Sequence, residues 1–349
     1  MGNNISKDSK RMGVISIKLF LCYSSTKNLE NYMEGTVYKS TGSWYFVKSE
    51  KGDFYECRIK GKFRIKGIKS TNPIAVGDKV HFEVETIGDD TIGIIHKIED
   101  RKNYIIRKSV NLSKQTHIIA SNLDQVFLLV TLNNPTTYPV FIDRFLVTAE
   151  AYDIPVTLLF NKVDTYNDDE LGEVKYLAAL YRKIGYDCIG ISALTGKNIG
   201  KVKAMMKGKT SMFSGHSGVG KSTLVNAIEP NLDIKTKKIS DQHLQGQHTT
   251  TFAEMYDLTF DSRIIDTPGI KGFGIVDMEP EEIGDYFPEF FELKQHCKFN
   301  NCIHTDEPKC AVKEALEEEA IAWSRYNSYL QMIKGEDENY RVDIYDEKK

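Results

Sequence analysis

Hydrophobic and polar positions alternate with a period of two in the first patterned part of this 349-residue chain. Short alternating runs, separated by glycine and other turn residues, predict five strands at residues 35–38, 43–47, 54–59, 79–84 and 91–95. Five short strands within about seventy residues are typical of a small β-barrel such as an OB-fold. We therefore expect an OB-fold domain over residues 33–107. The preceding residues 1–32 lack strong periodicity, and we expect them to form a disordered extension.

A second pattern begins near residue 114. Continuous apolar runs at 126–130 and 156–160 are typical of strands that are buried on both faces of a sheet. Apolar residues at 142–152 and 171–184 recur at helical spacing. Strands that alternate with helices predict a doubly wound α/β domain over residues 114–280, and we interpret residues 101–113 as a connector.

The last part of the chain, residues 281–349, favours a small helical domain with a charged tail. Its helical pattern carries an apolar stripe that we expect to lie in a core: Val312, Leu316, Ala320, Trp323 and Leu330.

Composition places the chain among soluble globular proteins. Hydrophobic residues make up 41% and charged residues 27%, and no apolar run approaches the ~20 residues of a membrane-spanning helix. Six cysteines are too few for a disulfide scaffold. We expect a cytoplasmic protein in which Cys57 and Cys188 are small buried hydrophobic residues.

The barrel region is locally basic although the whole chain has a formal charge of −3. Residues 36–69 contain nine Lys or Arg against three Asp or Glu, interleaved with aromatic residues. Cations neutralise RNA phosphates, and exposed rings stack on unpaired bases. Each ring can equally fill the barrel interior, so both interpretations remain open for these aromatics: Trp44, Tyr45, Phe46, Phe54, Tyr55 and Phe63.

A P-loop sequence follows a short predicted strand at 212–214 and opens a helical pattern. In such a loop, backbone N–H groups and the helix N-terminus bind phosphates, the lysine bridges the β- and γ-phosphates, and the serine binds Mg²⁺. The predicted nucleotide-binding residues are Gly215, His216, Ser217, Gly218, Val219, Gly220, Lys221, Ser222 and Thr223.

Two further segments are typical of sites that bind a nucleoside triphosphate. Asp266 and Gly269, in a DTPG sequence after the strand at 263–265, have the placement of an acidic residue near the metal and a glycine near the γ-phosphate. Residues 247–251 resemble a switch loop in which Thr250 binds Mg²⁺, although an edge strand is the alternative. Because Ile270 stands where many GTPases carry glutamine, we hypothesise that His248 positions the attacking water, the alternative being a loop cap or an RNA contact.

A guanine-reading sequence precedes the P-loop by about fifty residues. Asn161, Lys162 and Asp164 follow a buried strand, and the Asp164 carboxylate can accept from guanine N1–H and N2–H₂, a donor pair that adenine lacks. Ser192 and Ala193 end another candidate strand, where a backbone amide can meet guanine O6. GTPases of the usual chain order have the P-loop first. The inverted order therefore predicts a circularly permuted GTPase domain, because a sheet can be cut in one loop and rejoined at its termini.

Three thiols and one imidazole lie within fourteen residues of one another: Cys297, Cys302, His304 and Cys310. This set suits tetrahedral Zn²⁺ with all four positions closed, which is a structural site. Unrelated buried thiols are the alternative.

Together, the barrel, the order of the nucleotide motifs and the Cys/His cluster resemble the RsgA family of bacterial circularly permuted GTPases over residues 33–335. The resemblance implies a GTP hydrolase with GTP or GDP, Mg²⁺ and one Zn²⁺, which binds the small ribosomal subunit and its rRNA late in assembly and helps to release assembly factors. We expect a monomer that does not bind membranes. Two alternatives remain: a permuted GTPase that acts on another RNA or ribosomal particle, and a GTP-binding RNA module with little turnover.

Overall fold

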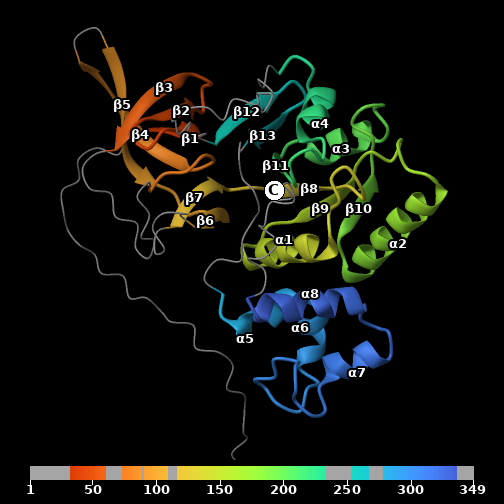
Figure 1. The fold of residues 1–349 in the computed structure, drawn as a ribbon. Helices are drawn as coiled ribbons and strands as arrows, with labels where there is room; N and C mark the ends of the chain where they lie inside the picture. Colours follow the sequence, from red (N-terminus) through yellow and green to blue (C-terminus); the bar gives the residue numbers. More distant parts are fainter. Residues whose placement is uncertain are drawn as a thin grey trace, which may run out of the picture. The chain divides into compact units, whose positions relative to one another are not determined.

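The computed structural model describes residues 32–59, 73–87, 90–108, 116–232, 253–266 and 278–335. The described residues from Met33 onward form one compact unit. Eleven of its strands form a single sheet in the order β10-β9-β8-β11-β13-β12-β1-β2-β3-β5-β4 (Figure 1). The barrel strands and the α/β strands thus belong to one hydrogen-bonded sheet.

The five predicted barrel strands are confirmed. They are β1 (Met33–Ser40), β2 (Tyr45–Ser49), β3 (Phe54–Ile59), β4 (Lys79–Ile87) and β5 (Asp90–Ile98). An additional pairing of β1 with β4 closes the sheet on itself, as in an OB-like barrel. Tyr45 and Phe82 fill the interior, as does Cys57, which is fully buried as predicted. Phe54, in contrast, is 57% exposed, so the predicted aromatic residues divide between buried and exposed positions.

The predicted connector contains a strand that the sequence analysis missed. β6 (Tyr104–Lys108) pairs with β7 (Thr116–Ser121) in a separate antiparallel ladder. Asp78, at the start of β4, ties the barrel to this ladder: its fully buried carboxylate accepts from the Arg101 guanidinium at 2.6 Å and from the Ser121 hydroxyl at 2.6 Å. Gly77 has a φ of +95°, and a Cβ there would lie 2.1 Å from the Ser121 carbonyl oxygen, so the turn requires glycine.

The predicted α/β domain is confirmed. Its parallel strands are β8 (Gln125–Val130), β9 (Val156–Phe160), β10 (Asp187–Gly190), β11 (Thr210–Ser214) and β13 (Ser262–Asp266), and β12 (Glu254–Leu258) lies antiparallel to β13. Four helices cover the sheet: α1 (Pro139–Ala151), α2 (Asp168–Ile184), α3 (Ile199–Met206) and α4 (Lys221–Ile228) (Figure 1). Every residue of β8 and β9 is buried, as their continuous apolar runs predict.

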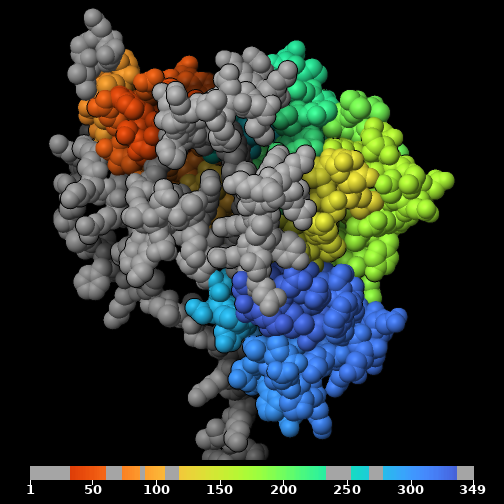
Figure 2. All heavy atoms as spheres, viewed as in Figure 1, coloured from red at the N-terminus to blue at the C-terminus, as the bar shows by residue number. Residues whose placement is uncertain are grey.

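The C-terminal part is helical as predicted, but the buried face differs from the predicted stripe. Its elements are α5 (Pro280–Ile283), η2 (Gly284–Tyr286), α6 (Pro288–Lys294), α7 (Ala311–Glu317) and α8 (Trp323–Ile333). They are drawn in shades of blue in Figure 2, and α8 contacts the α/β domain. Trp323 is 64% exposed and Ala320 is also exposed, so both predictions were wrong; Val312 is buried. α8 instead buries Arg325, Tyr326, Tyr329 and Met332.

Among the described residues, no helix is both long and apolar enough to cross a membrane.

Candidate functional site

The P-loop connects β11 to α4 through a chain of tight turns. Gly215, Gly218 and Gly220 have positive φ angles of 138°, 84° and 100°, which side chains other than glycine rarely adopt. Gly220 is the N-cap of α4, and Lys221 is the first helical residue. Ser217 and Gly218 are exposed, as are Ser222 and Thr223 in the first helical turn. The helix N-terminus with its free amides therefore faces accessible space, as phosphate binding requires.

The sheet topology places this loop at a switch point. Chain order runs outward from β8 through β9 to β10, and then returns to the other side of β8 with β11 and β13. In open α/β sheets, ligands bind at the carboxyl ends of strands where the order reverses. Loops that follow β8, β9, β10, β11 and β13 all leave from this edge, because these strands are parallel.

Asn161 joins three of the predicted motifs. Its side chain, 2% exposed, donates from Nδ2 to the Val219 carbonyl oxygen of the P-loop at 2.8 Å. Its Oδ1 accepts from the Ala193 amide at 3.0 Å. A single buried amide thus holds the segment after β9, the segment after β10 and the P-loop together. A Cβ on Gly220 would lie 2.4 Å from Asn161 Nδ2, so this close approach requires glycine.

The segment after β9 is fixed in turn by its neighbours. The Tyr166 hydroxyl donates to the Asn161 carbonyl oxygen at 2.9 Å and accepts from the Leu132 amide after β8 at 2.9 Å. The Lys162 ammonium donates to the carbonyl oxygen of Asn134 in the same loop after β8. The sequence pattern did not single out Asn134 or Tyr166, because neither lies in a recognised motif.

Electrostatics at the P-loop centre on Lys221. Its ammonium donates to the carbonyl oxygens of Gly215 and His216 at 2.6 and 2.7 Å. Burial lowers the pKa of Lys221, and the charge of Asp266 acts in the opposite direction. Asp266 is the last residue of β13, the strand that pairs with β11, and β11 leads into the P-loop. Burial and the charge of Lys221 both lower the pKa of His216.

The end of the site that is predicted to read guanine is exposed at Asp164. Ser192, two residues after β10, is fully buried, and its hydroxyl accepts from the Thr195 amide at 3.0 Å. The Ala193 amide is already bonded to Asn161. The next residue, Leu194, is 80% exposed.

Three predicted site residues lie outside the described residues: His248, Thr250 and Gly269. Their proposed roles in hydrolysis and Mg²⁺ binding therefore remain predictions.

The predicted metal cluster is assembled by the loops between α6 and α7. The ligand atoms of Cys297, Cys302, His304 and Cys310 all lie within 4.8 Å of one another. His304 Nδ1 is 3.3 Å from Cys310 Sγ and 3.7 Å from Cys297 Sγ, and these two sulfurs are 4.0 Å apart. A tetrahedral Zn²⁺ with ~2.3 Å Zn–S bonds needs sulfurs about 3.8 Å apart. The four donors therefore fit a closed zinc site, with the imidazole binding through Nδ1.

The surroundings of the cluster fix its loop. The Tyr326 hydroxyl of α8 donates to the His304 carbonyl oxygen at 2.7 Å. The Glu307 carboxylate accepts from the amides of Ile303 and Thr305 at 2.7 and 2.8 Å. His304 itself has a φ of +59°, and its ring packs edge-to-face on Phe290.

A buried ionic network joins the metal-binding part to the α/β domain. Arg325 of α8, 1% exposed, donates to Asp143 of α1 at 2.7 Å and to Glu289 of α6 at 2.7 and 3.1 Å. The Tyr181 hydroxyl of α2 also donates to Asp143, at 2.8 Å. Nothing in the sequence indicates this network, since an arginine beside an aromatic residue carries no signal that it will be buried.

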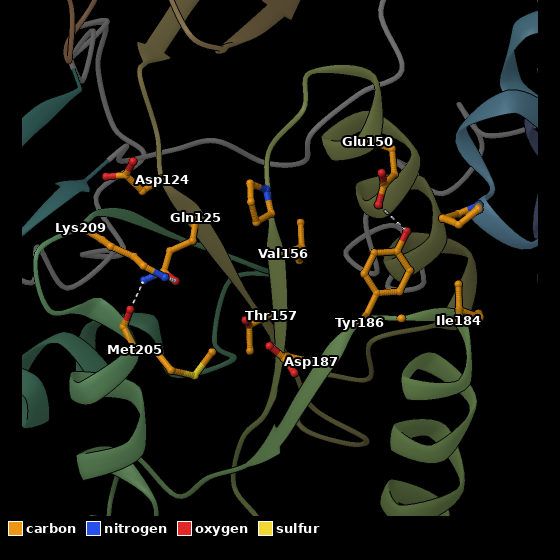
Figure 3. A pocket seen from close by; sticks show the side chains of 13 residues that line it. Asp124, Gln125, Glu150, Val156, Thr157, Ile184, Tyr186, Asp187, Met205 and Lys209 are labelled. Atoms are coloured by element: carbon orange, nitrogen blue, oxygen red, sulfur yellow. Dashed lines mark hydrogen bonds between the residues drawn. The ribbon is translucent and has the colours of Figure 1, made fainter.

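A separate hollow of about 370 Å³ lies at the opposite edge of the sheet (Figure 3). It is lined near the amino ends of β8, β9 and β10 by Gln125, Val156 and Asp187. The polar groups are largely paired with each other: Tyr186 donates to Glu150 at 2.9 Å, and Gln125 donates to the Met205 carbonyl oxygen at 2.9 Å. This hollow is distinct from the nucleotide-binding edge.

Comparison with known proteins gives the same result as the geometry. The family model described as RsgA GTPase matches residues 98–276, and the RsgA N-terminal domain model matches residues 34–95. Proteins named small ribosomal subunit biogenesis GTPase RsgA are 74% identical in Christiangramia forsetii, over 90% of this chain and 99% of the relative, and 70% identical in Flavobacterium johnsoniae, over 90% and 97%.

Solved structures agree in fold. YjeQ from Thermotoga maritima superposes with a TM-score of 0.69 at 36% identity, covering 87% of this chain and 98% of that one. YloQ, described as a circularly permuted GTPase, gives a TM-score of 0.68 at 30% identity, covering 90% and 99%. The permuted order of the nucleotide motifs, the barrel that precedes them and these matches over nine-tenths of the chain agree, and the chain belongs to the RsgA GTPase family.

Proposed function

We propose that this protein hydrolyses GTP while it is bound to the small ribosomal subunit, and that it acts in the maturation of that particle. The observation that carries the nucleotide part of the proposal is the Asn161 side chain, which bonds to both the P-loop and the Ser192–Ala193 segment. The ribosomal part rests on relatives of up to 74% identity that are named small ribosomal subunit biogenesis GTPases.

Recognition of GTP divides between the two ends of the site. The amides of the P-loop and the first turn of α4 bind the α- and β-phosphates, and Lys221 leaves its two carbonyl partners to reach the β- and γ-phosphates. The Asp164 carboxylate accepts from guanine N1–H and N2–H₂. Because the Ala193 amide is engaged by Asn161, guanine O6 accepts from the following amide, that of Leu194.

Hydrolysis requires residues at the γ-phosphate. Mg²⁺, when bound, would neutralise the negative charge that develops on the phosphate oxygens. Ser222 and Thr250 hold the ion, with Asp266 close by, and the Gly269 amide contacts the γ-phosphate. His248 positions the attacking water in place of the glutamine that Ile270 replaces. A His248→Ala chain that binds GTP normally and hydrolyses it at the wild-type rate would remove this role.

The remaining parts serve binding. The Cys/His cluster holds one structural Zn²⁺, and the barrel contacts rRNA through its cations and exposed rings, such as Phe54. The protein acts as a cytoplasmic monomer, and its nucleotide state governs the release of assembly factors.

The decisive experiment measures GTP turnover by the full chain alone, with purified small subunits and with purified large subunits. We expect slow turnover alone and strong acceleration by small subunits only, because the described residues supply neither an arginine finger nor a glutamine at the P-loop. Acceleration by large subunits instead would support the permuted GTPase of another particle. GTP binding with no turnover in any arm would support a binding module. Either result would overturn the proposal.

A further inference from the structure

Helix α1 contacts the phosphate loop at its amino end. Phe141, in the first turn of α1, packs against His216, the second residue of the P-loop, with ring centroids 3.8 Å apart and planes at 31°. Both side chains are half-buried. Burial and the charge of Lys221 lower the pKa of His216, so the ring is neutral at neutral pH and its contact with Phe141 is one between two uncharged rings.

The opposite face of α1 contacts α8, which belongs to the metal-binding part. Asp143 lies two residues after Phe141, and two residues correspond to a rotation of about 200° around a helix, so the two side chains leave opposite faces. Asp143 is fully buried and accepts from Arg325 Nη1 at 2.7 Å and from the Tyr181 hydroxyl at 2.8 Å.

Arg325 is fixed as firmly as its partner. Its guanidinium binds both Glu289 carboxylate oxygens and lies 4.4 Å from the centre of the Phe287 ring. Separation of Arg325 from Asp143 would leave the buried Asp143 carboxylate without a charged partner, which is strongly unfavourable. If His216 moves and α1 moves with it, α8 must therefore move as well, or the bond between Asp143 and Arg325 is weakened.

We propose that Phe141 is a positioning residue for the phosphate loop, and that α1 links nucleotide binding to α8 through the Phe141–His216 contact on one face and the Asp143–Arg325 pair on the other. The link rests on the proposed function only in requiring that guanine nucleotide binds at the P-loop. It runs within described residues and is separate from the chain connection through residues 267–277.

The test is hydrogen exchange of α8 amides in the full chain, with and without saturating Mg²⁺–GDP, together with GDP affinity from calorimetry. We expect GDP to slow exchange in α8 of the wild-type chain. Phe141→Leu, which removes the ring but keeps an apolar side chain, should abolish that response and weaken GDP binding about tenfold. Phe141→Tyr, which keeps the ring, should retain both.

Two controls separate the link from general destabilisation. Phe145→Leu makes the same change one turn later in α1, in the core, and should lower the melting temperature while the α8 response to GDP persists. Tyr181→Phe removes a hydrogen bond to Asp143 without touching the P-loop and should reduce the response, because the proposed link passes through Asp143. A Phe141→Leu chain that binds GDP and still slows α8 exchange as the wild type does would overturn the link alone. Failure of the wild-type chain to bind GDP would overturn the proposed nucleotide site as well.

Discussion

Replacement of Asn161 by alanine tests whether one buried amide organises the nucleotide site. The substitution removes the bond to the Val219 carbonyl oxygen at 2.8 Å and the bond from the Ala193 amide at 3.0 Å. Each bond contributes about 0.5–1.5 kcal/mol net, and a partner left buried and unpaired adds to the loss. We therefore expect the free energy of unfolding to fall by about 2–4 kcal/mol.

The effect on affinity follows from pre-organisation. If GDP binding had to supply all of the folding free energy that the substitution removes, the dissociation constant for GDP would rise between about 30-fold and about 1,000-fold, since 1.4 kcal/mol is a factor of ten. This range is an upper limit, because part of the loss is shared by the free and bound states. A rise of at least about tenfold is the expected result, measured by calorimetry with Mg²⁺–GDP alongside urea unfolding.

Asn103 offers a matched control. It is also buried and also bridges backbone groups in both directions: its Nδ2 donates to the Leu123 carbonyl oxygen and its Oδ1 accepts from the Leu123 amide, each at 2.8 Å. Asn103→Ala should cost similar stability and leave GDP affinity unchanged, because Asn103 bonds to none of the nucleotide motifs. The reasoning fails if Asn161→Ala binds GDP within about twofold of wild type, or if both variants lose the same affinity.

Four further results are expected. Asp164→Asn should weaken GDP binding roughly 100-fold, through two lost charge-assisted hydrogen bonds, and favour xanthosine diphosphate, whose 2-oxo group accepts from the new amide; competition calorimetry measures both. Cys302→Ser should reduce the zinc content from about one ion per chain towards none by atomic emission, whereas Cys188→Ser, at the buried position of strand β10, should retain it. Lys48→Gln should weaken binding to small subunits and lower the salt dependence of that binding by about one unit of log–log slope. The Thr259 hydroxyl and amide hold the pKa of Glu229 below its ordinary value, so its contribution to stability is present above about pH 4.3 and is lost as pH falls through the lowered pKa. Glu229→Gln should flatten that acid limb in urea unfolding.

Local patterns in the sequence predicted the elements and the nucleotide motifs because each motif directly follows a strand. β9 ends at Phe160 immediately before Asn161, and β13 ends at Asp266 itself. Parallel strands bring their carboxyl ends to one edge, so the positions of the motifs follow from the strand assignments. The Cys/His cluster could also be predicted from the sequence, since its four ligands lie within one short segment and the local loop alone brings them together.

Contacts between segments that are distant in the chain could not be predicted from the sequence in this way. Arg325 and Asp143 are separated by 182 residues, and nothing near either one indicates a partner. A charged side chain is expected at the surface, so the sequence assigned Trp323 to the core instead, and Trp323 is exposed. The role of Asn161 was only half apparent: its motif predicts guanine recognition, but its bonds to the P-loop depend on the order of strands in the sheet.

The pairing of β1 with β12 connects the barrel directly to the strand pair between the two segments that are predicted to contact the γ-phosphate. Glu254, the first residue of β12, is in register with Lys39 of the barrel and with Asp266 of β13. Two barrel cations also reach β12, since Lys39 binds Glu254 at 3.2 Å and Lys48 binds Asp257 at 2.6 Å.

Both ion pairs are partly exposed, so each contributes at most about 1 kcal/mol. An RNA phosphate that binds either lysine in place of β12 would therefore have to offset only a small free energy of the ion pair. β12 begins three residues after Thr251 and β13 ends just before Thr267, so this strand pair spans the interval between the two predicted γ-phosphate sensors. The proposed contact of the barrel with RNA would therefore act next to the two segments that are predicted to contact the γ-phosphate.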